Sequence, residues 1–121
     1  MIELERELQG TYKTIQISES QWEAEMTASA TWSYYLGHFP EQAVLPAVAI
    51  IDISQFLLSQ ISTSSEKISK IQDFRIKNPV RPGDKIKIQI QQKLPGSFHI
   101  LWLTLSHNLE DQKMYADLTI N

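Results

Sequence analysis

Two side chains of this sequence have the types and the spacing for acid–base chemistry. His38 lies in Leu36-Gly-His-Phe-Pro40, a stretch that glycine and proline mark as a loop. Asp52 follows fourteen residues later and carries the single formal charge between Gln42 and Ser65. A histidine titrates near neutral pH, and a carboxylic acid taken out of water can hold a proton to donate. The two residues are therefore an acid–base pair in outline, able to remove one proton and deliver another.

The segment around Asp52 predicts a helix that is apolar on almost every side. Residues 46–60 read Pro-Ala-Val-Ala-Ile-Ile-Asp-Ile-Ser-Gln-Phe-Leu-Leu-Ser-Gln. Such a helix is normally buried, and a buried carboxylate is costly unless it is paired, neutralised or beside a cavity. Pro46 suits the first helical turn, where its missing N–H is no loss. One alternative stays open: Asp52 is a structural polar group that Gln55 or Ser59 satisfies on the same helix face.

The other segments alternate with a period of two and predict strands. Residues 22–32 alternate strictly and give one apolar face, and residues 12–17 form the hairpin partner. Further strands are expected over residues 67–77, 85–92, 98–106 and 112–120. The stretch 98–106 is apolar on both faces, which predicts a central strand. A single buried helix needs a surface wrapped around it, and a curved antiparallel sheet can supply one.

Composition narrows the class of protein. The 121 residues are expected to form one domain, 1–121, and the absence of cysteine excludes disulfides and thiolate chemistry. The acidic start lacks the features of a signal peptide, and Asp52 argues against a membrane span, so we expect a cytoplasmic protein.

His38, His99 and His107 have no metal-site spacing. His99 and His107 are expected as ordinary strand histidines on one face, and Trp22, Trp32 and Trp102 as core residues.

Charge is distributed unevenly along the chain, although the net charge is only −3. The first 25 residues are acidic, whereas residues 67–87 carry seven cations against Asp73 and Asp84. Such a run either forms a solvated face or docks an acidic partner. Nucleic acid is not expected as a partner, because the chain is acidic overall and has no nucleic-acid motif.

One string of residues resembles a known family. Gly37-His-Phe-Pro-Glu-Gln-Ala-Val-Leu-Pro46-Ala-Val resembles the signature of the β-hydroxyacyl-ACP dehydratases of the FabA and FabZ type, roughly G-H-F-P-x-x-P-V-M/L-P-G-V with an acid fourteen residues after the histidine. Asp52 stands at the position of that acid, as in the FabA branch. Asn78-Pro-Val-Arg-Pro-Gly-Asp84 resembles the family's turn between strands. The short length looks closest to the small stand-alone ApeI-like members.

The resemblance implies a fold and an activity. The fold would be the α+β hot-dog fold, a curved antiparallel sheet wrapped around one long central helix. The activity would be that of a hydro-lyase converting (3R)-3-hydroxyacyl-ACP thioesters to trans-2-enoyl thioesters in fatty-acid or polyene synthesis, with no metal or other cofactor. His38 would take the α-proton, Asp52 would protonate the leaving hydroxyl, and the N–H of Ala47 would bind the thioester carbonyl. Further substrate contacts are expected from Gly37, Phe39, Pro46, Val48 and Gln55.

The resemblance also implies partners. In the family, the histidine and the acid of one site come from different subunits, and the acyl chain lies in a tunnel at the interface. We therefore expect a homodimer with shared active sites. The other partner would be an acyl carrier protein, which is acidic, so the basic segment supplies its candidate docking residues. These are Lys70, Arg75, Lys77 and Arg81.

Three positions depart from the family pattern. Ala43 replaces a proline, Ala47 replaces a glycine, and Phe56 stands where the family has a glutamine, with Gln55 one place earlier. Alanine keeps the backbone N–H that glycine would offer at the helix start. Two other functions stay open: a hot-dog acyl thioesterase, which would use an acid and a water on the same fold, and a non-catalytic acyl-carrier-binding subunit that pairs with an active paralogue, which Ala47 keeps open.

Overall fold

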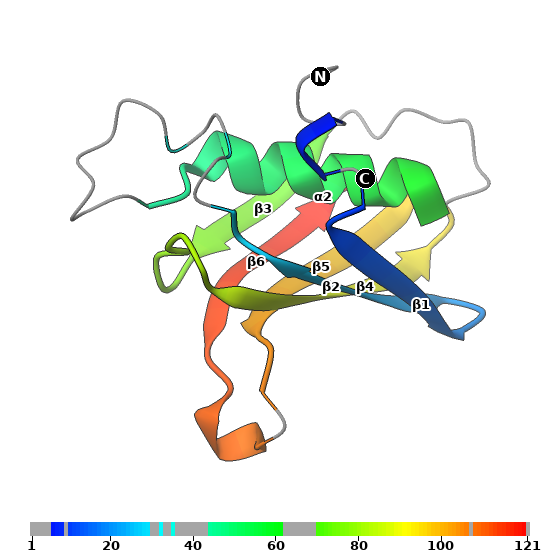
Figure 1. Cartoon of the computed structure of the whole chain (residues 1–121). Helices are drawn as coiled ribbons and strands as arrows, with labels where there is room; N and C mark the ends of the chain where they lie inside the picture. The colour runs from blue at the N-terminus through cyan, green and yellow to red at the C-terminus, as the bar shows by residue number, and fades with distance from the viewer. Residues whose placement is uncertain are drawn as a thin grey trace.

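The computed structural model describes residues 6–8, 10–29, 32, 35, 44–61, 70–106 and 108–120. In this part of the chain, six strands form one antiparallel sheet, and one long helix, α2 (Ala47–Ile61), lies along its face (Figure 1). The strands are β1 (Tyr12–Ser18), β2 (Gln21–Thr27), β3 (Ile71–Ile76), β4 (Lys85–Leu94), β5 (Ser97–Thr104) and β6 (Met114–Ile120), with a short 3-10 helix, η3 (Leu109–Asp111), between the last two. The expected order of two strands, one helix and four strands is confirmed.

The strand order explains why the helix crosses the sheet. The sheet runs β1-β2-β4-β5-β6-β3, so three strands separate β2 from β3 although they are consecutive in the sequence. The chain must pass over those three strands, and α2 lies on that connection (Figure 1). Register irregularities at Gln16/Ser18, Gln92/Leu94, Trp102/Leu103 and Ile71/Asp73 interrupt four of the strand pairs. Irregularities of this kind increase twist and bend a sheet, which suits one that curves around a helix.

The core lies between α2 and the inner face of the sheet. On the helix, the buried side chains share one side, and on the sheet they occupy every second position. The helix contributes Ala49, Ile50, Ile53, Ser54, Phe56, Leu57 and Leu58. The sheet contributes Ala24, Met26, Ile86, Ile88, Ile90, Phe98, Ile100, Trp102, Ala116, Leu118 and Ile120. The period of two in the strands therefore predicted correctly which side chains would face inward.

One polar contact joins the helix to the sheet inside this core. The indole Nε1–H of Trp102 on β5 donates a hydrogen bond to Oγ of Ser54 on α2 at 2.9 Å. Both residues have an exposed fraction of 0%. Because the contact ties one position of the helix to one strand, it fixes which side of α2 faces the sheet. Asp52 lies two residues before Ser54, and two residues correspond to a rotation of about 200° around the helix axis. The side chain of Asp52 therefore points away from the sheet.

Two expectations about strand length were wrong. The strand expected over residues 22–32 ends at Thr27, and beyond it the backbone of Ala28 bonds to Gly83 and Asp84, the last residues of the turn before β4. Trp32 is nevertheless buried, as a core residue outside any strand. The strand expected over residues 98–106 ends at Thr104. His107, which was expected on the same strand as His99, lies outside the described residues. The central place of β5, between β4 and β6, is confirmed.

Two further expectations are corrected in part. The helix begins at Ala47, and Pro46 precedes it with a carbonyl that accepts hydrogen bonds from Ala49 and Ile50 at 3.0 and 3.3 Å. Trp102 and Trp32 are buried, whereas Trp22 is half-buried.

Within the described residues, no helix has both the length and the apolar character needed to cross a membrane.

The Ser54–Trp102 contact gives a first test of this core. Ser54→Ala leaves a buried N–H without an acceptor, which is expected to lower the free energy of unfolding by about 1–3 kcal/mol. Chemical denaturation of Ser54→Ala, Trp102→Phe and the double variant would measure the coupling between the two residues. A coupling of at least about 0.5 kcal/mol is expected, because residues in direct contact are not additive.

Ser59→Ala is the matched control on the same helix. Ser59 is an exposed residue, and its hydroxyl donates to the carbonyl of Phe56 at 2.6 Å. Its loss should change stability by no more than about 0.5 kcal/mol. Equal losses from Ser54→Ala and Ser59→Ala would show that the buried contact does not fix the helix.

Candidate functional site

One side of α2 is partly exposed to solvent, and Asp52 lies on this side, which we call the open face. Val48, Asp52 and Gln55 follow one another at intervals of four and three residues, so they share one face of α2. The side chain of Val48 is 56% exposed, and Asp52 and Gln55 are half-buried. The expectation of a helix buried all round is therefore correct for the sheet side alone. A half-buried carboxylate on this open face is accessible to a substrate and shielded in part from water.

The start of α2 lies one turn from Asp52. Ala47 and Val48 form the first helical positions, and the first turn contains no acidic residue. The first N–H groups of a helix have no partner inside it and carry partial positive charge. They are therefore suited to stabilise negative charge on an oxygen close to Asp52.

The departure at Phe56 now has a structural explanation. Phe56 is buried and packs edge-to-face on Tyr12 of β1, with ring centroids 5.7 Å apart at 87°. Its ring fills the core below β1 and does not reach the open face. Gln55 lies on the open face three residues after Asp52. The amide is therefore available beside Asp52 from the earlier position.

The structure brings together part of the expected site. Pro46, Ala47, Val48, Asp52 and Gln55 lie at or near the start of α2 and on its open face. Gly37, His38 and Phe39 lie outside the described residues. The geometry of the acid–base pair therefore stays a prediction.

The expected docking residues are all exposed and lie on or next to β3, an edge strand of the sheet. Lys70 precedes β3, Arg75 lies within it, and Lys77 and Arg81 follow it. Nε of Arg75 forms an exposed ion pair with Oδ2 of Asp73 at 3.6 Å. Part of the positive charge of the segment is thus neutralised locally.

An acidic side chain and two tyrosines form a second polar cluster, which the sequence did not reveal. Oδ2 of Asp84 accepts hydrogen bonds from the backbone N–H of Arg81 at 3.0 Å and from the hydroxyl of Tyr115 at 3.1 Å. Burial, together with the charge and hydrogen bond of Asp84, raises the pKa of Tyr115 to about 12. Burial raises the pKa of Tyr35 well above its ordinary value, and the charge of Asp84 adds to the effect.

A histidine–aspartate pair lies on the opposite face of the sheet. Nε2 of His99 on β5 lies 2.6 Å from Oδ1 of Asp117 on β6, and both side chains are about two-thirds buried. These residues alternate with the core residues Ile100 and Leu118, so they occupy the outer face. His99 is therefore a strand histidine with a polar partner, remote from Asp52. Among the described residues, no three His, Asp or Glu side chains gather as a metal site.

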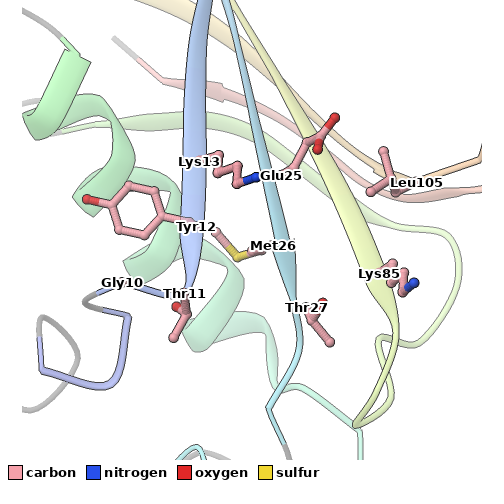
Figure 2. A pocket seen from close by; sticks show the side chains of 9 residues that line it. All are labelled: Gly10, Thr11, Tyr12, Lys13, Glu25, Met26, Thr27, Lys85 and Leu105. Carbon is pink, nitrogen blue, oxygen red and sulfur yellow. The ribbon is translucent and has the colours of Figure 1, made fainter.

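A pocket of about 310 Å³ also lies away from Asp52. Gly10, Thr11, Tyr12, Lys13, Glu25, Met26, Thr27, Lys85 and Leu105 line it. Figure 2 shows these residues on β1, β2 and the start of β4, with Gly10 and Thr11 just before β1 and Leu105 just after β5. Its lining contains none of the expected site residues, so it is not the acid–base site.

The comparisons with known proteins define the class. The ApeI-like family model, described as ApeI dehydratase, matches residues 14–116. The chain belongs to this family of hot-dog dehydratases.

Individual relatives agree with that assignment. The 3-hydroxyacyl-[acyl-carrier-protein] dehydratase FabZ of Herpetosiphon aurantiacus is 36% identical over 47% of this chain and 45% of the relative. The chain spans about half the length of the curated relatives it matches. Among solved structures, the dehydratase heterocomplex ApeI:P from Xenorhabdus doucetiae matches with a TM-score of 0.75 and 19% identity, covering 90% of this chain and 92% of that one.

Two further structural matches are inactive variants of the CurK dehydratase. One has a histidine replaced by phenylalanine and the other an aspartate replaced by asparagine, with TM-scores of 0.65 and 0.64 and identities of 17% and 16%. Both cover 93% of this chain and 42% of theirs. At these identities, the structural matches establish the fold, which is the hot-dog fold.

The tyrosine cluster predicts a loss of stability in alkali. Between pH 10 and about 12, the unfolded chain releases the proton of Tyr115 while the folded chain retains it. The free energy of unfolding should therefore fall as the pH rises through this window. Tyr115→Phe removes this titration, so denaturation midpoints at pH 8 to 11 should fall less steeply for the variant. Parallel profiles for the variant and the wild type would contradict the assigned pKa.

Proposed function

We propose that this protein dehydrates (3R)-3-hydroxyacyl thioesters, carried on acyl carrier protein, to trans-2-enoyl thioesters. The observation that carries the proposal is the position of Asp52, which is half-buried on the open face of α2, one turn from the helix start, while the other side of the helix packs on the sheet. Family membership and the Gly37–Val48 motif support the same reaction. The pathway is proposed to be fatty-acid or polyene synthesis.

The chemistry needs one base and one acid. His38 removes the proton from C2, and the electron pair forms the C2–C3 double bond. Asp52 donates its proton to the C3 hydroxyl, which leaves as water. The N–H of Ala47 stabilises the negative charge that grows on the thioester oxygen. Pro46, Val48 and Gln55, with Gly37 and Phe39, contact the substrate.

A second chain is proposed to complete the site. The open face of α2 exposes Val48 beside Asp52, and a partner covering this face would exclude water from the acid. We propose a homodimer in which His38 of one chain serves Asp52 of the other. The Xenorhabdus doucetiae protein forms a heterocomplex, which supports pairing with a paralogue as the alternative.

A non-catalytic role in such a pair is the second candidate function. Ala47 in place of the family's glycine adds a methyl group at the helix start, where the thioester would bind. Incubation of the pure protein with 3-hydroxyacyl-ACP, followed by mass spectrometry of the acyl group, distinguishes the candidates. Loss of water supports the dehydratase, free acid supports a thioesterase, and no reaction until a paralogue is added supports the non-catalytic subunit. The reverse hydration of an enoyl thioester gives an independent readout.

Two substitutions test the acid–base pair. Asp52→Asn keeps the volume and removes the acidic proton, and His38→Ala removes the base. Each is expected to lower kcat by about 10²–10⁴-fold, with the thermal unfolding midpoint close to that of the wild type. An Asp52→Asn protein with kcat within about tenfold of the wild type would make Asp52 a structural polar group.

Mixing the two inactive variants tests the shared site. In a mixed dimer, one of the two sites has both wild-type residues, so random exchange should restore about a quarter of the wild-type activity. Light scattering and native mass spectrometry would verify the mixed dimer. A verified mixed dimer without activity would show that each chain carries a complete site.

The carrier would dock on the basic residues next to β3. Arg75→Glu with Arg81→Glu should raise KM for ACP-bound substrate and leave turnover of a small thioester nearly unchanged, because such surface charges act mainly on association. Lys13→Glu with Lys93→Glu is the matched control, since both lysines are exposed and lie on β1 and β4. Equal effects of the two pairs would show that only net charge matters.

A further inference from the structure

The turn between β3 and β4 connects parts of the chain that are distant in sequence. Residues 77–84, which we call the 77–84 turn, bond to the backbone or side chains of Ala28, Tyr35, Leu45 and Tyr115. Ala28 follows β2, and Leu45 leads through Pro46 into α2. The turn therefore lies between the end of β2 and the start of the helix that carries Asp52.

The contacts to the two flanking segments are short. Gly83 N–H donates to the carbonyl of Ala28 at 2.7 Å, and Ala28 N–H donates to the carbonyl of Asp84 at 2.8 Å. On the other side, the carbonyl of Val80 accepts the N–H of Leu45 at 2.8 Å and the hydroxyl of Tyr35 at 3.3 Å. Val80 is buried, with an exposed fraction of 1%. The turn thus holds the chain on both sides of the segment whose sequence contains His38.

The side chain of Asp84 maintains the shape of the turn. Its Oδ2 accepts the N–H of Arg81 within the turn and the hydroxyl of Tyr115 from β6. Gly83 has a φ of 92°, a conformation that favours glycine, and the carboxylate closes the turn around it. The backbone N–H of Lys77 also donates to the carbonyl of Tyr115 at 2.8 Å. The turn is therefore anchored to the sheet at one end and shaped by one carboxylate at the other.

We infer that Asp84 is a positioning residue for the dehydratase site: it fixes the shape of the 77–84 turn, and the turn holds the end of β2 and the start of α2 in fixed positions relative to each other. This inference rests on the proposed function. The consequence for catalysis is geometric, because a displacement of about 1 Å in reacting groups can cost about 10²-fold in rate. Asp84 acts through the backbone of Val80 and Gly83 and does not contact the substrate.

The first experiment compares Asp84→Ala with Asp84→Asn. The alanine variant loses the acceptor, whereas the asparagine variant keeps an oxygen that can accept from Arg81 and Tyr115. Asp84→Ala is expected to lower kcat between about tenfold and 10²-fold, with KM for a small thioester nearly unchanged, and Asp84→Asn should recover most of the rate. Asp111→Ala is the matched control, because Asp111 is an exposed aspartate in η3. A kcat for Asp84→Ala equal to that of the control would overturn the inference.

Hydrogen exchange tests the same inference without any activity. In Asp84→Ala, the amides of Ala28 and Leu45 should exchange faster, while the amides of β4 and β5 in the centre of the sheet keep their protection. Unchanged exchange at Ala28 and Leu45 would overturn the inference, as would acceleration spread evenly over the sheet. If the wild-type protein has no dehydratase activity, the proposed function fails while the exchange result still tests the role of Asp84 in the fold.

Discussion

The burial of one side of α2 against the inner face of the sheet is the constraint on which the rest of this structure depends. The helix supplies seven buried residues to the core, and alternate residues of β2, β4, β5 and β6 pack against them. Apolar burial alone does not specify the rotation of a nearly uniform apolar helix, because several faces could serve. The hydrogen bond from Trp102 to Ser54 makes one rotation preferable, since any other leaves a buried donor without an acceptor.

The orientation of Asp52 follows from that choice. With Ser54 on the sheet, Asp52 lies on the opposite side of the helix, together with Val48 and Gln55. A carboxylate in this position avoids the cost of full burial and still borders the apolar helix. The same arrangement leaves exposed apolar surface at Val48, which a second chain can cover. Fold stability and the proposed chemistry thus depend on opposite faces of one helix.

The 77–84 turn supplies the second constraint on the site. It joins Ala28, Leu45 and Tyr115, which are far apart in the sequence, through backbone carbonyls and one carboxylate. The order of strands makes this possible, because β2 lies next to β4 and the turn leads directly into β4. A change at Asp84 therefore acts on the end of β2 and on the start of α2 together. This explains how a residue outside the proposed chemistry can influence it.

The sequence by itself determined the order of elements, the inward-facing residues of the strands and the family. These follow from local periodicity and from one contiguous motif, Gly37–Val48. Only the tertiary structure decided where β2 ends, at Thr27, where the chain meets the turn residues Gly83 and Asp84 through the backbone of Ala28. It also decided that His99 pairs with Asp117, that Asp84 bonds to Tyr115, and that Phe56 faces Tyr12. Each of these contacts joins residues distant in sequence, whose meeting depends on strand order and helix rotation rather than on any local pattern.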